Sequence, residues 1–237
     1  MILLSFVLLG LHAQEGRIER KIENRTIIPK GQWVLGFNTM YNHVKVDNFN
    51  LFVINNINAD GYNLEVSPFV LYTFKDNLSA GVKFSYDRSL LRIDSFDVEF
   101  GESSLANVKD LYSLQHTYSG IALLRQYISM GDLKRFALFS DFQLSLSGSQ
   151  AKILNGKGDS LIGTYETNFS LGIGVTPGVV AFVTDRTAAE ISVGLLGIDY
   201  SITKQNTNRV ETSSRSSSKG NFLVNLFSIK LGMSWYI

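Results

Sequence analysis

A short stretch near the end of the first third of the chain decides the fold: LSAGVKFSY, residues 78–86. Its apolar and aromatic side chains alternate with small or polar ones. The first set is Leu78, Ala80, Val82, Phe84 and Tyr86, and the second is Ser79, Gly81, Lys83 and Ser85. A period of two is the pattern of a β-strand with one apolar face. The stretch therefore predicts a strand whose two faces meet different surroundings.

The same alternation recurs along the whole chain. It marks about eight segments, at residues 32–44, 61–74, 78–91, 112–129, 134–149, 163–183, 188–202 and 220–237. Each is longer than the about 9–11 residues that a tilted strand needs to cross a bilayer. The fold predicted from this pattern is all-β, a transmembrane antiparallel up-and-down barrel of about eight strands over residues 32–237.

The connections between these segments alternate in length. Three are tight and rich in turn-forming residues, at 75–77, 130–132 and 184–187. The other four are long and polar, at 45–60, 92–111, 150–162 and 203–219. Short turns on one side and long loops on the other are typical of an outer-membrane barrel, whose short turns face the periplasm.

The chain has 237 residues, which suits one barrel domain or two small domains. Of these residues 18% are charged, against about 25% in an average soluble domain. It has no cysteine, which excludes disulfides and thiolate metal sites. The formal net charge of +1 gives no reason to expect a nucleic-acid partner.

The N-terminus has the pattern of a secretory signal. Residues 1–11 form a short apolar run that ends before His12-Ala13-Gln14, and charged residues follow. The run is too short to span a bilayer. We expect a signal peptide at residues 1–14 and a periplasmic segment at residues 15–31, and export is consistent with a bacterial outer-membrane location.

A membrane barrel turns its apolar face outward, so its polar side chains point into the lumen. The ionisable residues that share parity with the polar set of their strands are Glu65, Lys83, Asp87, Arg125, Asp141, Glu166, Glu190 and Lys230. In a narrow lumen such charges pair, because an unpaired buried charge is costly. We therefore expect them to form a structural network that plugs the barrel.

Aromatic residues are expected at the two levels where a membrane barrel meets lipid headgroups. The periplasmic belt would be Trp33, Tyr72, Phe74, Phe136 and Trp235, and the outer belt Tyr41, Tyr86 and Tyr165.

The last strand carries a family resemblance. Its alternate residues, Phe227, Ile229, Leu231, Met233, Trp235 and Ile237, are similar to the C-terminal signal that the barrel-assembly machinery recognises in small outer-membrane barrels of the OmpA/OmpX/OmpW type. The run at residues 67–81, with aromatics before an Asp-Asn turn, resembles the second hairpin of these barrels. The resemblance implies outer-membrane lipid and the assembly machinery as partners.

Four functions are compatible with the sequence. The favoured one is a structural or surface-interaction role through the outer loops, which could bind a surface ligand, above a plugged lumen. The alternative is a narrow channel for a small or apolar solute, with Pro68 and Pro177 loosening the wall. A rim enzyme acting on lipid or peptide would use His43 or His116, with Ser85, Asp87 or Ser113 near. A soluble binding barrel would enclose Phe84, Phe169 and Trp235.

No motif in the sequence assigns catalytic, cofactor-binding or metal-binding residues. We therefore expect a protein that is not an enzyme and carries no cofactor.

Overall fold

The computed structural model describes residues 26–51, 54–100, 103–130, 135–156, 161–194, 196–207, 211–222 and 229–237. Their strands are β1 (Trp33–Leu51), β2 (Ile54–Lys75), β3 (Leu78–Phe100), β4 (Ser103–Ser129), β5 (Phe136–Asn155), β6 (Ile162–Phe182), β7 (Thr187–Val193), β8 (Leu196–Thr207), β9 (Glu211–Phe222) and β10 (Ile229–Tyr236). The described part of the chain contains no helix that is long and apolar enough to cross a membrane. The predicted signal peptide and residues 15–25 lie outside the described residues.

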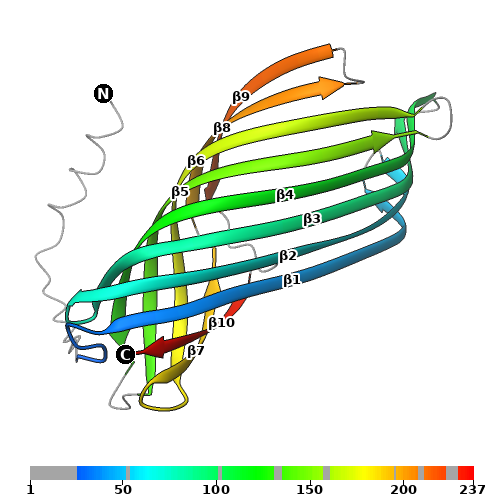
Figure 1. Cartoon of the computed structure of the whole chain (residues 1–237). Coiled ribbons are helices and arrows are strands. Elements are labelled where there is room, and N and C mark those ends of the chain that lie inside the picture. Colours follow the sequence, from blue (N-terminus) through cyan, green and yellow to red (C-terminus); the bar gives the residue numbers. More distant parts are fainter. Residues whose placement is uncertain are drawn as a thin grey trace, which may run out of the picture.

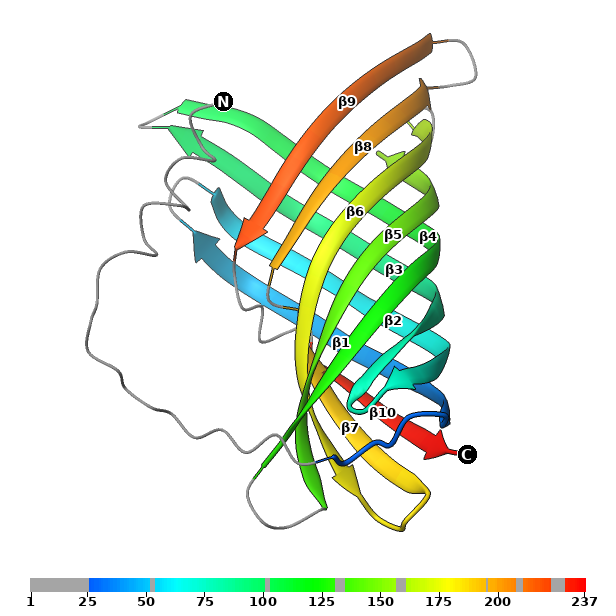
Figure 2. The ribbon, with the colours of Figure 1, turned by 90° about the vertical axis from the view of Figure 1, so that its left-hand side faces the viewer.

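The strands form one antiparallel sheet that closes on itself (Figures 1 and 2). The sheet order is β5-β4-β3-β2-β1-β10-β7-β6-β8-β9, and β5 also pairs with β6. That last pairing closes a ring of β1 to β7 and β10. The predicted up-and-down barrel of about eight strands is therefore confirmed, with the seventh predicted strand divided into β7 and β8.

The division coincides with a change of partner along β6. Residues 178–182 of β6 pair with β7, whereas residues 164–175 pair with β8, and the register shifts by one residue between them. Pro177, which lacks a backbone N–H, lies between the two pairing segments. Pro68 lies in β2 without any shift of register nearby, so only one of the two prolines accompanies a break in the wall.

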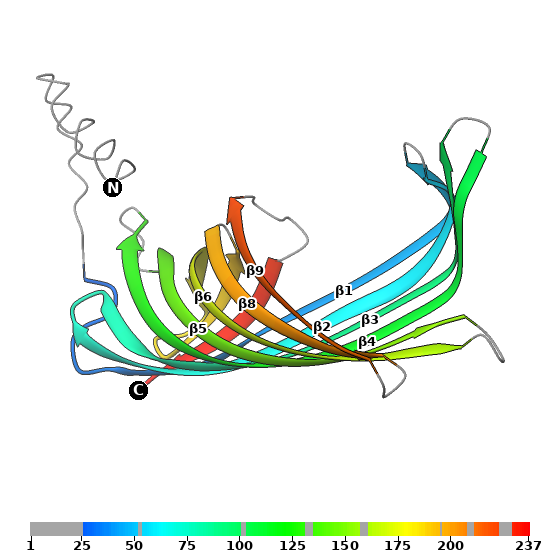
Figure 3. The same cartoon turned by 90° about the horizontal axis from the view of Figure 1, so that it is seen from above.

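Among the described residues the ring is closed over only part of its height. β1 pairs with β10 from Val34 to Thr39, and β9 is the last strand of the sheet order, with β8 as its partner. Figure 3 shows β1 to β4 continuing far beyond the short β10.

The four connections predicted as long polar loops are mostly strand, so that prediction was wrong. Residues 45–51, 92–100, 150–155 and 203–207 continue strands, and the serine-rich residues 211–219 lie in β9. The sequence of these extensions places polar residues at positions of both parities, so the apolar alternation disappears while the backbone ladder continues. Only short segments separate the strands, at 52–53, 101–102, 156–161 and 208–210.

At the opposite end the predicted tight turns at 75–77 and 184–187 are present, whereas residues 131–132 of the predicted turn at 130–132 lie outside the described residues. The β2–β3 turn also fixes the segment before β1. Asn77 has a positive φ of 61°. Its Oδ1 accepts hydrogen bonds from the N–H groups of Ile27 and Ile28, at 2.8 and 3.0 Å. Asp76 accepts another from the N–H of Lys30 at 2.8 Å. Residues 26–31 therefore lie against the turn end, where Ile28 is only 1% exposed.

The barrel has apolar side chains outside and polar ones inside. Val82, Ile173 and Leu231 are 59%, 64% and 56% exposed on the outer surface. Fully buried polar side chains inside include Ser67, Ser79, Thr73 and Ser234. Phe84, Phe169 and Trp235 are also exposed, which excludes the soluble barrel that would enclose them.

Aromatic side chains mark two levels on the outer surface. At the turn end Trp33 packs on Tyr72 with ring centroids 5.1 Å apart, and Phe74 and Phe136 are exposed. Trp235 is also exposed there, opposite Thr187 at the start of β7. Further along, Tyr41 stacks on Tyr62 and Tyr86 packs on Tyr118. From Trp33 to Tyr41 the strand advances about 26 Å, or about 20 Å along the axis of a barrel tilted by about 40°. Such a band matches the hydrocarbon layer.

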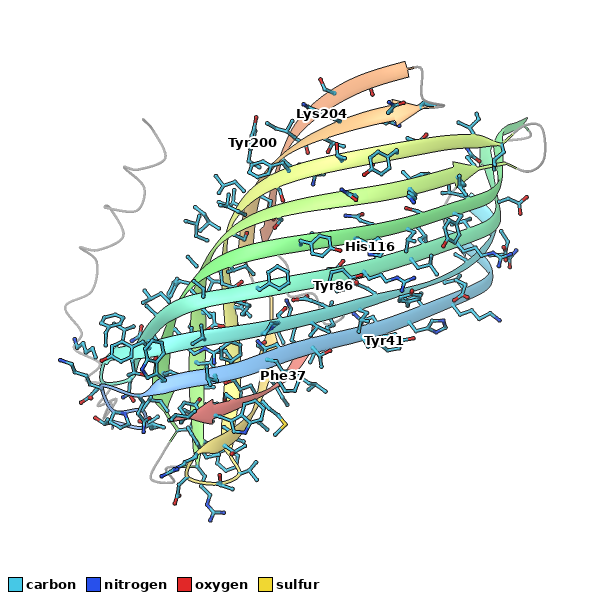
Figure 4. All side chains as sticks on the ribbon, in the orientation of Figure 1. Phe37, Tyr41, Tyr86, His116, Tyr200 and Lys204 are labelled. Atoms are coloured by element: carbon cyan, nitrogen blue, oxygen red, sulfur yellow. The ribbon has the colours of Figure 1, made fainter. Side chains whose placement is uncertain are left out.

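The second level lies part-way along the strands, whereas the sequence had placed it near the strand ends. Figure 4 labels Phe37 and Tyr41 on β1 and Tyr86 on β3, with long stretches of strand continuing past both tyrosines. β1 extends to Leu51, which places its last ten residues beyond Tyr41.

The face assignment predicts opposite responses at two neighbouring positions of β5. Leu144→Arg puts a charge on the exposed apolar surface and is expected to cost about 2–4 kcal/mol in a bilayer. Ser145→Arg points inward, where Asp199 lies next to the Ser145 side chain across Gly172 and can pair with the new charge. The measurement is the fraction of refolded protein that migrates as the compact, heat-modifiable band. Equal yields from the two variants would refute the face assignment.

The contact between the β2–β3 turn and residues 26–31 predicts a second effect. Asn77→Ala removes the acceptor for two N–H groups and places in positive φ a residue that tolerates it less well than Asn, at a combined cost of about 2–3 kcal/mol. Asn77→Gly keeps the backbone conformation and is expected to cost about half as much. Urea midpoints of both variants test this, and an Asn77→Ala midpoint equal to that of the wild type would show that the contact contributes nothing.

Candidate functional site

The candidate site is the centre of the lumen, where Arg125 of β4 is completely buried. Its Nε and Nη2 donate to the two carboxylate oxygens of Asp141 on β5, at 2.6 and 2.9 Å. Its Nη1 donates to both oxygens of Glu190 on β7, at 2.9 and 3.0 Å. One guanidinium thus joins three strands through two carboxylates, the geometry for which its planar fork is suited.

Aromatic rings enclose the same guanidinium. Its Cζ lies 4.1 Å from the ring centroid of Phe139 and 4.9 Å from that of Phe69. Cation–π contacts of this kind are strongest where water is excluded. Asp141 and Glu190 are each about 1% exposed, so the whole ion cluster is dry.

Lys83 extends the cluster to β3. Its Nζ lies 3.8 Å from Asp141 Oδ2 and 6.0 Å from the Phe69 ring centroid, and its side chain is 5% exposed. Together with Arg125, Asp141 and Glu190 it forms what we term the central ion layer, which draws on β3, β4, β5 and β7.

A second polar group lies beside this layer. Lys230 of β10 donates to Oε1 of Glu65 on β2 at 2.5 Å. The same oxygen accepts from Ser67 at 2.7 Å and from Ser85 at 3.1 Å. The Glu65 carboxylate therefore joins β2, β3 and β10, and β10 is itself the neighbour of β7, which carries Glu190.

The remaining two residues of the predicted network, Asp87 and Glu166, lie in different surroundings. Asp87 is opposite Glu65 in the β2–β3 register and so lies beside the second group. Glu166 is opposite Gln205 on β8, and it has no ion-pair partner among the described residues. The structure thus brings seven of the eight predicted residues into these two groups and leaves Glu166 apart.

Sequence reasoning missed an apolar layer that closes the turn end of the lumen. Its buried side chains are Ile28, Val34, Phe69, Leu71, Leu123, Tyr127, Ala137, Phe139, Val180, Ala188 and Tyr236. The sequence contained a signal for this layer. Leu71 lies on the same face of its strand as the polar residues Ser67 and Thr73, and Phe139 lies on the same face as Asp141. In a narrow barrel closed by side chains, large residues are needed inside as well as outside.

The arrangement holds strands together and excludes water, which is a structural role. The two histidines considered for rim chemistry point to the outer surface: His43 Nε2 lies 2.9 Å from Asp60, and His116 Nδ1 lies 2.8 Å from the Tyr86 hydroxyl. Neither contact includes a serine nucleophile. Among the described residues no group of three or more histidine or carboxylate side chains is placed to hold a metal ion.

The C-terminal pattern follows the outer surface of β10. Ile229, Leu231, Met233, Trp235 and Ile237 are all exposed there, at 39% to 69%. Phe227, the first residue of that pattern, lies outside the described residues.

Comparison with known proteins gives a limited likeness. No protein-family model matches the chain, and no curated protein matches it. The chain is similar to the outer membrane protein OprG from Pseudomonas aeruginosa, at 12% identity over 89% of this chain and 97% of OprG, with a TM-score of 0.39. A major outer membrane protein from Thermus thermophilus gives 10% identity, 87% and 99% coverage and a TM-score of 0.42.

A third solved structure, Neisserial surface protein A, is 16% identical over 87% of this chain and 97% of its own, with a TM-score of 0.31. All three TM-scores are below 0.5, so the argument for the fold rests on the strand pairing and side chains described above.

The central ion layer predicts unequal costs for the loss of two lumen cations. Arg125→Met leaves two buried carboxylates unpaired and is expected to lower the free energy of unfolding by about 3–5 kcal/mol. Lys230→Met leaves Glu65 with two serine donors in a partly exposed place, and about 1–3 kcal/mol is expected. Urea titration of the refolded variants measures both. A larger loss for Lys230→Met would contradict the central position assigned to Arg125.

Proposed function

We propose that this protein is an integral barrel of the bacterial outer membrane, with a closed lumen and a structural or surface-interaction role at its outer end. The observation that carries the closed lumen is Arg125, which is fully buried between Asp141 and Glu190 in the centre of the ring. The proposed role is not enzymatic.

The outer-membrane location is supported by the polarity of the two faces. The outward positions between Trp33 and Tyr41 on β1 are Leu35, Phe37 and Thr39, none of which is charged. A closed antiparallel ring satisfies all backbone groups within itself, which is the condition for crossing a bilayer with strands. Outer-membrane lipid is therefore the first partner in this proposal.

Assembly requires a second partner. The exposed alternate residues of β10, from Ile229 to Ile237, support recognition by the barrel-assembly machinery, as in the barrels whose C-termini they resemble. The outward face of β10 carries no charged side chain. The strand therefore presents a continuous apolar face before the ring closes.

The interaction role rests on how far the strands extend past the tyrosine level. Beyond Tyr41 and Tyr86, β1 to β6 form a sheet with polar residues on both faces, as in Ser89, Gln115 and Gln150. A rigid sheet offers a surface ligand an ordered backbone and fixed side chains, so a ligand loses less of its binding free energy to ordering than it would on mobile loops.

A second candidate, passage of a small apolar solute, rests on a different observation. In the part of the chain that the structure describes, the β1–β10 pairing ends at Thr39 and β9 ends the sheet order. A solute could leave the outer half sideways through the wall between them, without crossing the central ion layer. Uptake of an apolar solute into vesicles is the measurable property that separates this candidate from the first.

Single-channel conductance in a planar bilayer separates an open lumen from a closed one. A correctly refolded wild-type barrel is expected to give no steady conductance, because the central ion layer and the apolar layer below it leave no aqueous path. Refolding is checked beforehand by heat-modifiable migration. Reproducible conductance steps would overturn the closed lumen, whereas silence together with uptake of an apolar dye into vesicles would favour the sideways path.

A further inference from the structure

The outer surface of the β5–β6–β8 wall changes from apolar to cationic within a few residues. Along β8 the outward residues are Ile198, Tyr200, Ile202 and then Lys204, the first three of which are 64%, 48% and 40% exposed. Figure 4 labels Tyr200 and Lys204 on this wall. Along β6 the outward row passes from Phe169 to Thr167 and Tyr165. Lys204 therefore lies directly past the end of the apolar surface.

Two lysines flank one aromatic ring at this level. Lys152 of β5 is directly opposite Tyr165 in the β5–β6 register, which places their Cβ atoms about 5 Å apart. Lys204 is opposite Thr167 in the β6–β8 register, two residues from the position opposite Tyr165. No carboxylate among the described residues pairs with either lysine. Glu166 belongs to the other face of β6.

A pocket of about 470 Å³ opens beside Lys204. Its lining residues are Tyr165, Thr167, Lys204, Gln205, Asn206, Ser213 and Ser214. The lining thus combines one amine, two amides, hydroxyls and an aromatic ring, with no acidic residue. The Gln205 Oε1 accepts a hydrogen bond from the Ser213 hydroxyl at 3.3 Å, so it is already partnered.

One polar atom of the pocket lacks a partner in the described part of the chain. The Oδ1 of Asn206 is buried and accepts no hydrogen bond there. A buried acceptor of this kind costs about 1–3 kcal/mol when it stays unsatisfied. A hydroxyl group of a ligand in the pocket would satisfy it, while the lysine amine would bind an anion.

We propose that this pocket binds the phosphorylated sugar headgroup of a glycolipid in the outer leaflet. The phosphate would lie on Lys204, with Lys152 nearby, and a sugar hydroxyl would donate to Asn206 Oδ1. The acyl chains would lie on the apolar surface directly below, over Phe169 and Ile202. That continuity favours a lipid-borne sugar over a soluble one. The inference rests on the outer-membrane location proposed above.

The test is native mass spectrometry of the refolded full chain in detergent micelles, with a diphosphorylated lipid A as the probe. The wild type is expected to retain one molecule of this glycolipid, and Lys204→Gln and Asn206→Leu should each lower the bound fraction about tenfold. Lys45→Gln removes the same charge from the outward surface of β1, on the other wall, and should change the bound fraction less than twofold.

Each other outcome overturns the proposal in a defined way. Equal loss from Lys45→Gln would show general charge attraction, and equal retention of phosphatidylglycerol would show that the sugar is not recognised. Retention of a fully dephosphorylated lipid A would remove the role of Lys204. If all variants show the heat-modifiable band and none binds the glycolipid, this inference fails while the outer-membrane barrel stands; loss of that band in the wild type would instead undermine the barrel proposal.

Discussion

The structure depends on one constraint: inside a hydrocarbon layer every backbone N–H and C=O must be bonded within the protein. The ring meets this constraint along the span where its described strands close. β1 pairs with β10 up to Thr39, two residues before Tyr41 at the second aromatic level. Among the described residues this pairing does not continue beyond that level, where water can bond the backbone.

Because the ring is narrow, the same constraint places large side chains where they must pack or pair. Glu190 and Asp141 are buried carboxylates that pair with Arg125, and the buried guanidinium of Arg125 is in turn paired by both. The rings of Phe69 and Phe139 cover the guanidinium, and the apolar layer continues from them to Tyr236 and Ile28. Residues 26–31 complete this end, so a segment outside the strands becomes part of the core.

The sequence allowed good prediction wherever the two faces of a strand meet different surroundings. Alternation at Leu78–Tyr86 assigned faces correctly, and the turn at Asn77 was evident from its residue types. The strand extensions were missed because polar residues such as Gln150 and Lys152 occupy the outward face there. A pattern based on an apolar outward face cannot mark such residues as strand. Tyr127 and Leu123 were missed as lumen residues because alternation shows which side chains share a face, whereas the space inside a ring depends on how many strands close it.

The end of the described sheet at β9 has a consequence for association with other chains. Among the described residues this strand pairs with β8 alone, so its other side presents backbone groups along residues 211–222. Such an edge is a template on which an extended peptide, or the same strand of a second copy, can add. The closed ring offers no such template. Among the described strands, addition is therefore expected at this open edge, where a fibre or strand-exchanged dimer would begin.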